Sequence, residues 1–180
     1  MKKYVLKIII ANLILLIPLA SLAYQFPPNT YYDVCFTPGG ACTSKIVNLI
    51  NNAKKEILVQ AYSFTSAPIA KSLVGANRRG VNVKVILDKS QFKHNKYSAS
   101  RFLLNNNISV WIDYKPAIAH NKVIIVDNNI VETGSFNYTK SAQYRNAENV
   151  LIIKNYKLAQ IYKDNWFRRK HLSKKVANTN

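Results

Sequence analysis

The stretch from Ala119 to Thr139, AHNKVIIVDNNIVETGSFNYT, gathers side chains that could do chemistry on a phosphate group. His120 and Lys122 stand two residues apart at the start of an apolar run, and residues two apart on a β-strand point to the same face. A neutral imidazole nitrogen is a competent nucleophile toward phosphorus, and an ammonium group stabilises charge on the non-bridging oxygens. This pattern indicates a site for displacement at a phosphodiester.

Further polar side chains follow the apolar run. Two asparagines at positions 128 and 129 allow a tight turn, so segment 129–134 is predicted to return antiparallel to strand 121–127. The hairpin would bring Gly134, Ser135 and Asn137 back beside the histidine. The glycine permits close backbone approach, and the hydroxyl and the amide supply the hydrogen-bond donors that an oxyanion needs.

The aspartate of the stretch is predicted to have a structural role. Asp127 lies seven positions after His120, an odd number, so a regular strand would turn its side chain to the opposite face. We expect it to hold the junction between strand and turn. The chain has only eight acidic residues, scattered along its length, so we predict neither a metal site nor a cofactor.

The joint spacing of these residues resembles the signature of the phospholipase D superfamily. The signature is His-x-Lys, four residues, Asp, six residues and Gly-Ser-x-Asn, and it is present here once, from His120 to Asn137. Residues 61–88 and 134–153 also resemble small bacterial endonucleases that carry a single copy of this motif. Exported phospholipase D-like proteins of intracellular bacteria are similar as well. The resemblance implies the same fold with one motif per chain.

The resemblance also implies a mechanism in two displacements. His120 would attack phosphorus and form a phosphohistidine, a second histidine would protonate the leaving oxygen, and water would then hydrolyse the intermediate. Because the chain has one motif, a homodimer would place a second His120 opposite the first. His94 and His171 are the internal alternatives, and we expect both on solvated surface.

A carboxylate near the end of the motif region completes the implied catalytic set. Glu148 matches the family's acid that hydrogen-bonds the other nitrogen of the nucleophilic histidine, where it would fix the tautomer and support the imidazolium. The residue would equally suit the edge of a strand. Asn149 is its weaker neighbour.

The remaining pattern predicts an α/β fold with a mixed sheet flanked by helices, because apolar runs of strand type alternate with helical segments. Residues 89–97 are polar and basic and indicate a surface loop, and residues 173–180 indicate a loose tail. The first helix has Thr43 or Ser44 as its candidate N-cap. We expect helices at 43–55, 66–80, 98–107 and 156–172, and strands at 56–64, 81–88, 108–114, 121–127, 129–134 and 147–154.

The first 23 residues have the layout of a secretory signal peptide. A basic start precedes 13 apolar residues, and Ser-Leu-Ala follows them, with Ala23 as the expected last residue removed. An uncleaved membrane anchor is the alternative, although a spanning helix needs about 20 apolar residues. We therefore predict a signal peptide at 1–23, one domain at 24–180, and a protein that is periplasmic or secreted.

The two cysteines agree with export. Cys35 and Cys42 flank a Pro-Gly-Gly turn, and an oxidising compartment would let them close a short loop as a disulfide. Two unpaired buried thiols are the alternative. A metal site is disfavoured, because two thiols without a histidine or further cysteine nearby make half of a coordination shell.

The charge of the chain points to a polyanionic partner. The formal net charge is +18, and removal of Lys2, Lys3 and Lys7 from the 26 basic residues would leave 23 against 8 acidic ones, an excess of +15. Such an excess attracts nucleic acid or an anionic membrane. Candidate phosphate contacts are Lys89, Lys93 and Lys96, with Arg78 and Arg79, and bases could stack on Tyr97 and Tyr114.

Three functions are compatible with this sequence. A nonspecific endonuclease acting on DNA or RNA is favoured, and a phospholipase D that releases phosphatidic acid is the alternative. A silent module that binds nucleic acid or membrane is the third. The terminal helix, with Leu158, Ile161, Trp166 and Phe167 beside Arg168 and Arg169, could touch a bilayer, but we expect it to pack on the domain.

Overall fold

The computed structural model describes residues 24–92 and 98–177. Its eight strands form one sheet in the order β1-β7-β6-β5-β2-β3-β4-β8. Strands β2, β3 and β4 are parallel to one another, and every other neighbouring pair is antiparallel. The strands are β1 (Tyr32–Thr37), β2 (Glu56–Ala61), β3 (Asn82–Asp88), β4 (Ser109–Asp113), β5 (Lys122–Val126), β6 (Ile130–Gly134), β7 (Glu148–Lys154) and β8 (Lys174–Lys175).

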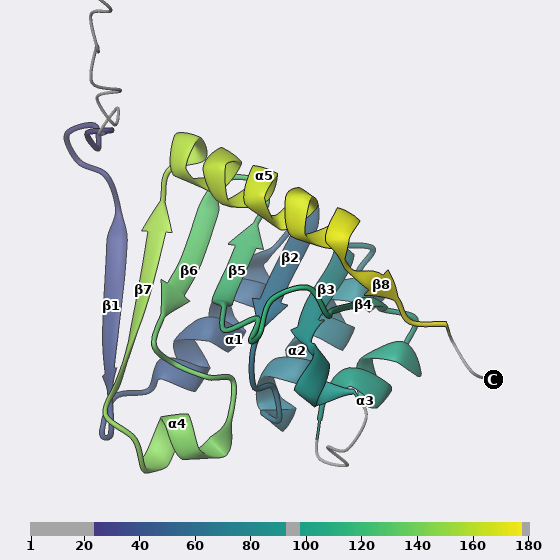
Figure 1. Cartoon of the computed structure of the whole chain (residues 1–180). Helices are drawn as coiled ribbons and strands as arrows, with labels where there is room; N and C mark the ends of the chain where they lie inside the picture. The colour runs from purple at the N-terminus through teal and green to yellow at the C-terminus, as the bar shows by residue number, and fades with distance from the viewer. Residues whose placement is uncertain (1–23, 93–97, 178–180) are drawn as a thin grey trace, which may run out of the picture.

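Helices cover both faces of the sheet. Figure 1 shows α5 crossing one face, with α1, α2 and α3 on the other and α4 beyond the lower end of the strands. The arrangement confirms the predicted α/β fold with a mixed sheet between helices. The helices are α1 (Cys42–Asn52), α2 (Ala67–Arg78), α3 (Ser100–Leu104), α4 (Lys140–Tyr144) and α5 (Tyr156–Leu172), with a 3₁₀ turn η1 (Lys89–Gln91).

Each layer rests on its own apolar cluster. Alternate residues of β2 divide between the two clusters, since Ile57 packs on the α1 and α2 side while Leu58 packs under α5. The indole of Trp166, fully buried, donates a hydrogen bond to the carbonyl of Val59 at 3.0 Å and so anchors α5 to the centre of the sheet. Burial of a large apolar side chain contributes about 1.5–3 kcal/mol to the free energy of unfolding. The terminal helix therefore packs on the domain, as predicted.

Three elements were not predicted from the sequence: β1, α4 and β8. Strand β1 pairs with β7 at one edge of the sheet, and Cys35 within it forms a disulfide with Cys42 at the start of α1. Helix α1 begins at Cys42 with Ala41 at its N-cap, so neither Thr43 nor Ser44 caps it. Part of the expected loose tail becomes β8, which pairs with β4 at the opposite edge.

The N-terminal segment 1–23 lies outside the described residues, so the predicted signal peptide stays a prediction. Among the helices in the described part of the chain, none has both the length and the apolar character that crossing a bilayer requires.

A carboxylic acid is buried in the core beneath the Gly-Ser-x-Asn segment. The side chain of Glu132, on β6, is wholly inaccessible to solvent and accepts a hydrogen bond from the phenol of Tyr138 at 2.6 Å. Burial raises the pKa of Glu132 from its ordinary 4.5 to about 8, and the bond from Tyr138 only partly opposes this shift. Glu132 is therefore protonated in the folded protein at neutral pH.

This raised pKa makes stability depend on pH. The folded state keeps a proton that the unfolded state releases above pH 4.5, so the free energy of unfolding falls by up to about 1.4 kcal/mol per pH unit between pH 4.5 and 8. Glu132→Gln keeps the carbonyl that accepts from Tyr138 and cannot ionise. We expect the variant to gain stability over the native chain from pH 5 to pH 8 in urea unfolding curves. A difference that stays constant across this range would contradict the assignment.

Candidate active site

His120 and Lys122 lie together where β5 begins. The pairing of β5 with β2 sets Lys122 opposite Ala61, and the amide of Tyr62 continues the ladder by donating to the carbonyl of Asn121 at 2.9 Å. The Nζ of Lys122 lies 3.0 Å from Nδ1 and 3.2 Å from Nε2 of the His120 ring, and it donates to the His120 carbonyl at 2.9 Å. The predicted neighbourhood of imidazole and ammonium is therefore present.

The environment of Lys122 shifts the pKa of its own ammonium group. The lysine is 6% exposed, and this burial lowers its pKa, while the charge of Glu148 acts in the opposite direction. An ammonium has three hydrogens to donate and nothing to accept, so it can bond only to an imidazole nitrogen that carries no proton. The contact thus suits a neutral imidazole, which is the nucleophilic form.

Tyr62 supports this pair, although the sequence did not single it out. Its ring centroid lies 4.6 Å from that of His120, and the ammonium of Lys122 lies 5.3 Å from it. The aromatic face therefore limits where the imidazole can turn and favours the nearby positive charge. Nothing in the sequence marks Tyr62 as a site residue, because it belongs to an apolar run. Its place beside His120 follows only from the pairing of β2 with β5.

Asp88 positions the residue that precedes the histidine, and it too was missed. It ends β3 and is 2% exposed, and its carboxylate accepts hydrogen bonds from the amides of Ala119 at 2.7 Å and Ser90 at 2.9 Å. Burial opposes ionisation, but these bonds prevail and lower the pKa of Asp88. The buried carboxylate thus fixes the approach of the chain to His120.

Asp127 holds the junction between strand and turn, as predicted. Its carboxylate accepts from three consecutive backbone amides at the start of β2, those of Lys54 at 2.9 Å, Lys55 at 2.7 Å and Glu56 at 3.0 Å. The turn itself is centred on Asp127 and Asn128, both with positive φ, one residue earlier than the expected pair of asparagines. The hairpin of β5 and β6 is nevertheless antiparallel, as expected.

Gly134 allows β6 to lie very close to β7. A Cβ at this position would stand 2.2 Å from the carbonyl oxygen of Asn149, and the φ of +154° is one that other residues rarely adopt. The same carbonyl accepts from the amide of Ser135 at 3.2 Å. The glycine is therefore required to keep Ser135 against β7.

Ser135 and Glu148 form one hydrogen-bonded group. The hydroxyl of Ser135 donates to the Glu148 carboxylate at 2.5 Å and accepts from the amide of Asn149 at 3.0 Å, while the amide of Asn146 donates to the other carboxylate oxygen at 2.9 Å. The described contacts of Glu148 do not include a hydrogen bond to His120. Its predicted bond to the imidazole stays a prediction, and its charge acts on Lys122.

Asn137 sits on a segment that is fixed at both ends. Gly134 ends β6 on one side, and on the other the carbonyl of Tyr138 accepts from the amides of Thr65 and Ser66, each at 2.8 Å. The Oδ1 of Asn137 is buried and has no hydrogen-bond partner among the described residues. A buried acceptor left unpaired costs about 1–3 kcal/mol, and a donor from a ligand would remove that cost.

The candidate phosphate-binding residues differ in position and in the contacts that they make. Lys89 donates to the carbonyl of Pro116, in the loop that leads to His120, and so lies near the site. Arg78 bonds to the side chain of Asn106, and Arg79 bonds to carbonyls at the end of α1, so both guanidinium groups are engaged in joining helices. Tyr114 is partly buried against the core. Lys93, His94, Lys96 and Tyr97 lie outside the described residues.

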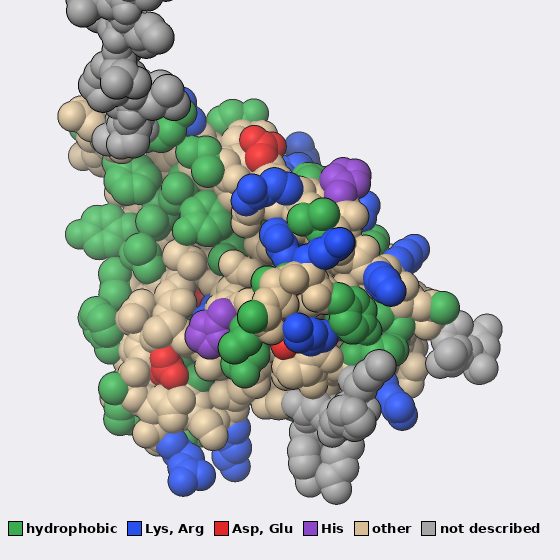
Figure 2. Space-filling model, viewed as in Figure 1, with side chains coloured by type: hydrophobic (Ala, Val, Ile, Leu, Met, Phe, Trp, Pro, Cys, Tyr) green, Lys and Arg blue, Asp and Glu red, His purple; other side chains and the backbone are tan. Residues whose placement is uncertain are grey.

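The site is open to solvent. His120 and Ser135 are exposed and Glu148 is partly exposed. Figure 2 shows a histidine and an acidic side chain on this face, beside a field of hydrophobic side chains. Among the residues that the structure describes, no three His, Cys, Asp or Glu side chains converge as a metal site would need. His171, the other described histidine, is in the last turn of α5 beside β8.

Comparison with known proteins agrees with this geometry. Residues 46–170 match the family described as "Cardiolipin synthase, PLD-like domain". The chain is 44% identical over 160 residues to a phospholipase D of Rickettsia felis, covering 83% of this chain and 80% of that protein. It is 49% identical over 144 residues to a phospholipase D of Rickettsia prowazekii, covering 80% and 70% respectively.

A solved structure is also similar. It is that of Nuc from Salmonella typhimurium, described as a phospholipase D family member, and it superposes with a TM-score of 0.78 at 38% identity, over 82% of this chain and 98% of that one. The fold therefore agrees with that of this relative. The chain belongs to the phospholipase D superfamily and is a hydrolase of phosphodiester bonds.

Proposed function

We propose that the chain hydrolyses phosphodiesters without a metal ion, through a covalent intermediate on His120. The observation that carries the proposal is the contact between the His120 ring and the buried ammonium of Lys122, 3.0 Å away, with the hydroxyl of Ser135 directly after the neighbouring hairpin strand. This set offers a nucleophile, a fixed positive charge and a hydrogen-bond donor within one site.

The chemistry proceeds in two displacements. A neutral nitrogen of His120 attacks phosphorus, the bond from phosphorus to the leaving oxygen breaks, and a second, protonated histidine gives that oxygen its proton. Water then attacks the phosphohistidine, the nitrogen–phosphorus bond breaks, and the second histidine takes up the water proton. Lys122 and Ser135 stabilise the charge on the non-bridging oxygens in both transition states. The products are an alcohol and a phosphomonoester.

A homodimer would supply the second histidine. One face of the edge strand β1 is strongly exposed, with Tyr32 at 67%, Val34 at 37% and Phe36 at 66%. We call these three residues the β1 strip. Phe36 lies opposite Asn149, whose amide contacts Ser135, so the strip leads directly to the site. An exposed apolar surface of this kind favours association, and we propose that the strip is part of a two-fold contact through which a second His120 reaches the site.

Nucleic acid is the favoured substrate. The excess of basic residues gives long-range attraction to a polyanion, and the open site suits a bond within a polymer. Cleavage would be largely independent of sequence, because contacts to phosphates carry no sequence information directly. We therefore propose a nonspecific endonuclease.

Phospholipid is the second candidate. Two relatives that share 44% and 49% identity with this chain are named phospholipase D, and in a protomer without a partner the β1 strip could contact acyl chains. A silent binding module is the least favoured alternative, since the chain carries the complete motif.

We also propose that the protein is exported. The layout of residues 1–23 supports this, and so does the disulfide between Cys35 and Cys42, because such bonds persist in oxidising compartments. The chemistry proposed for the active site does not depend on where the protein is located.

The first test concerns the nucleophile and the substrate. Purified protein is incubated in chelator with plasmid DNA, RNA and labelled phosphatidylcholine. We expect DNA and RNA to be cut, and His120→Ala to lose at least about 10⁴-fold in turnover because no other group can form the intermediate. Native protein quenched in alkaline denaturant, in which a phosphohistidine survives, should carry the phosphoryl label on histidine.

Two results would contradict these assignments. Turnover by His120→Ala at the native rate would exclude His120 as the nucleophile. Hydrolysis of phosphatidylcholine without cleavage of nucleic acid would replace the endonuclease by a phospholipase D.

The second test concerns the dimer. Val34→Glu puts a charge in the middle of the β1 strip, so we expect a monomer in analytical ultracentrifugation and a loss of turnover of at least about 10²-fold, the scale of a lost proton donor. Phe102→Glu is the matched control, because Phe102 is 41% exposed on α3, away from the strip. A Val34→Glu monomer with native turnover would show that one chain is sufficient.

A further inference from the structure

Almost all acidic residues of this chain make contacts within the chain, as ion pairs or hydrogen bonds. Three form ion pairs with lysine or arginine, two accept from backbone amides, one is buried beneath Tyr138 and one belongs to the active site. Within the described residues, only Asp164 stands exposed on α5 without such a contact. The ion pairs are those of Asp33, Glu56 and Asp113, and the acceptors from backbone amides are Asp88 and Asp127. The buried acid is Glu132, and the acid of the active site is Glu148.

Unpaired lysines gather at the edge of the sheet formed by β4 and β8. The ammonium groups of Lys170 and Lys175 lie 5.0 Å and 5.7 Å from the ring centroid of Trp111, and that of Lys174 lies 5.7 Å from the ring of Tyr114. None of the three makes an ion pair with the acids of the described chain. We call Lys170, Lys174 and Lys175 the β8 lysine cluster.

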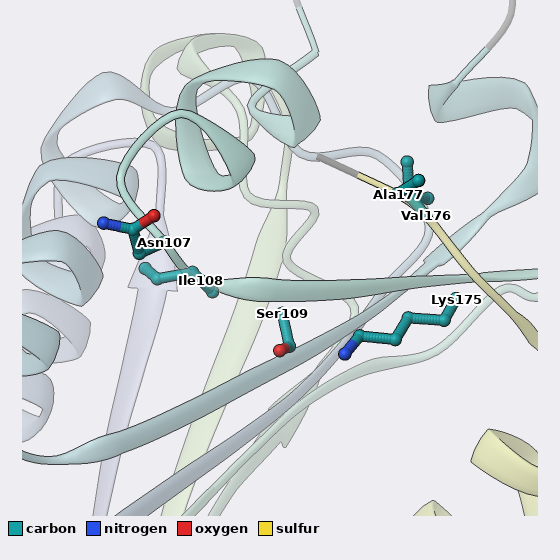
Figure 3. A pocket seen from close by; sticks show the side chains of 6 residues that line it. All are labelled: Asn107, Ile108, Ser109, Lys175, Val176 and Ala177. Atoms are coloured by element: carbon teal, nitrogen blue, oxygen red, sulfur yellow. The ribbon is translucent and has the colours of Figure 1, made fainter. Parts of the chain in front are cut away.

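A hollow adjoins this cluster. Its volume is about 430 Å³, and it is lined by Asn107, Ile108, Ser109, Lys175, Val176 and Ala177. Figure 3 shows the amine of Lys175 directed toward the hydroxyl of Ser109, with the amide of Asn107 farther along the same wall. An ammonium, a hydroxyl and an amide are the donors that hold a phosphate group. The hollow therefore has the chemistry of a phosphate contact.

The cluster is distant from the active site and lies along the β8 edge, where Lys170 and Lys175 stand over Trp111 on the α5 face and Lys174 projects from the other face beside Tyr114. Strands β5 and β8 are four strand spacings apart in the sheet, or about 19 Å. Figure 2 shows lysine and arginine side chains over α5 and toward the C-terminal edge, on the same face as a histidine. A polymer bound at His120 can place a later phosphate at β8, whereas a single phospholipid headgroup cannot span that distance.

The cluster is also poorly suited to a bilayer. Trp111 is only 8% exposed and its ring faces the ammonium groups, so it is not free to insert among acyl chains. The exposed aromatic residues of the β1 strip lie at the opposite edge of the sheet. Leu172, at 43%, is exposed between Lys170 and Lys174, but one apolar side chain among three ammonium groups still favours a hydrated polyanion over a membrane.

We propose that the β8 lysine cluster, with the adjoining hollow, is a second phosphate-binding surface that holds the backbone of a nucleic acid whose scissile bond lies at His120. The proposal rests on the endonuclease activity proposed above and adds where the polymer is held. It follows that affinity for a long strand depends on β8, while the chemical step does not.

The test uses the full chain with Lys170, Lys174 and Lys175 each changed to Gln, which removes three charges and keeps most of each stem on its aromatic ring. The matched control changes Lys54, Lys55 and Lys71 to Gln, since these exposed lysines lie around α1 and α2, outside the cluster. Thermal unfolding checks that both variants fold. Binding of a fluorescent 30-nucleotide DNA is measured in chelator at several salt concentrations.

We expect the β8 variant to bind at least about tenfold more weakly, with a slope of log Kobs against log salt reduced by about 2, and the control to change much less. Both variants should hydrolyse bis(p-nitrophenyl) phosphate, which is too small to reach β8, at the native rate. Equal weakening in both variants would overturn the proposal in favour of net charge. Native DNA binding with lost binding to phosphatidylglycerol vesicles would overturn it in favour of a membrane.

This design separates two failures. If the native protein does not cut DNA, the endonuclease assignment fails whatever the slopes are. If it cuts DNA and the β8 variant shows the native KM and salt slope, the endonuclease stands and the β8 surface fails.

Discussion

The close contact between β6 and β7 at Gly134 is the constraint on which the active site depends. At this point the backbone of β7 occupies the space that any Cβ would fill, and the carbonyl of Asn149 accepts from the amide of Ser135. The contact brings Ser135 to Glu148, while the other side of the same hairpin presents Lys122 and His120. Lys122 and His120 at the start of β5 and Ser135 after β6 thus form one site because the hairpin of β5 and β6 is fixed between β2 and β7.

Three carboxyl groups, two of them buried and one partly exposed, keep this arrangement rigid. Asp127 ties the hairpin turn to the start of β2, Asp88 ties the end of β3 to the residue before His120, and Glu132 supports Tyr138 beneath the Gly-Ser-x-Asn segment. Each of these carboxyl groups acts on backbone or on a core side chain instead of on substrate. Three of the eight acids therefore position the site, while His120 and Ser135 stay exposed.

Much of this could be predicted from the sequence, and the limits have physical causes. The core strands were predicted because their apolar runs are long, and the hairpin followed from two turn-forming residues between such runs. Strand β1 was missed because its alternating pattern was interpreted as a cysteine loop, and β8 was missed because two lysines carry no strand signal until an edge strand offers them partners. Tyr62 and Asp88 act on the site through strand pairing, which a single sequence does not encode in its local pattern.

The internal use of carboxyl groups has a consequence for how these molecules meet one another. Their outer surface carries nearly one sign of charge, so two copies repel in most relative orientations. In the dimer proposed above, the apolar edge of β1 would be where that repulsion is offset by buried area. The relative orientation of two copies would then be set by repulsion between their other faces as much as by attraction at β1. Added salt would screen this repulsion and permit encounters through other faces.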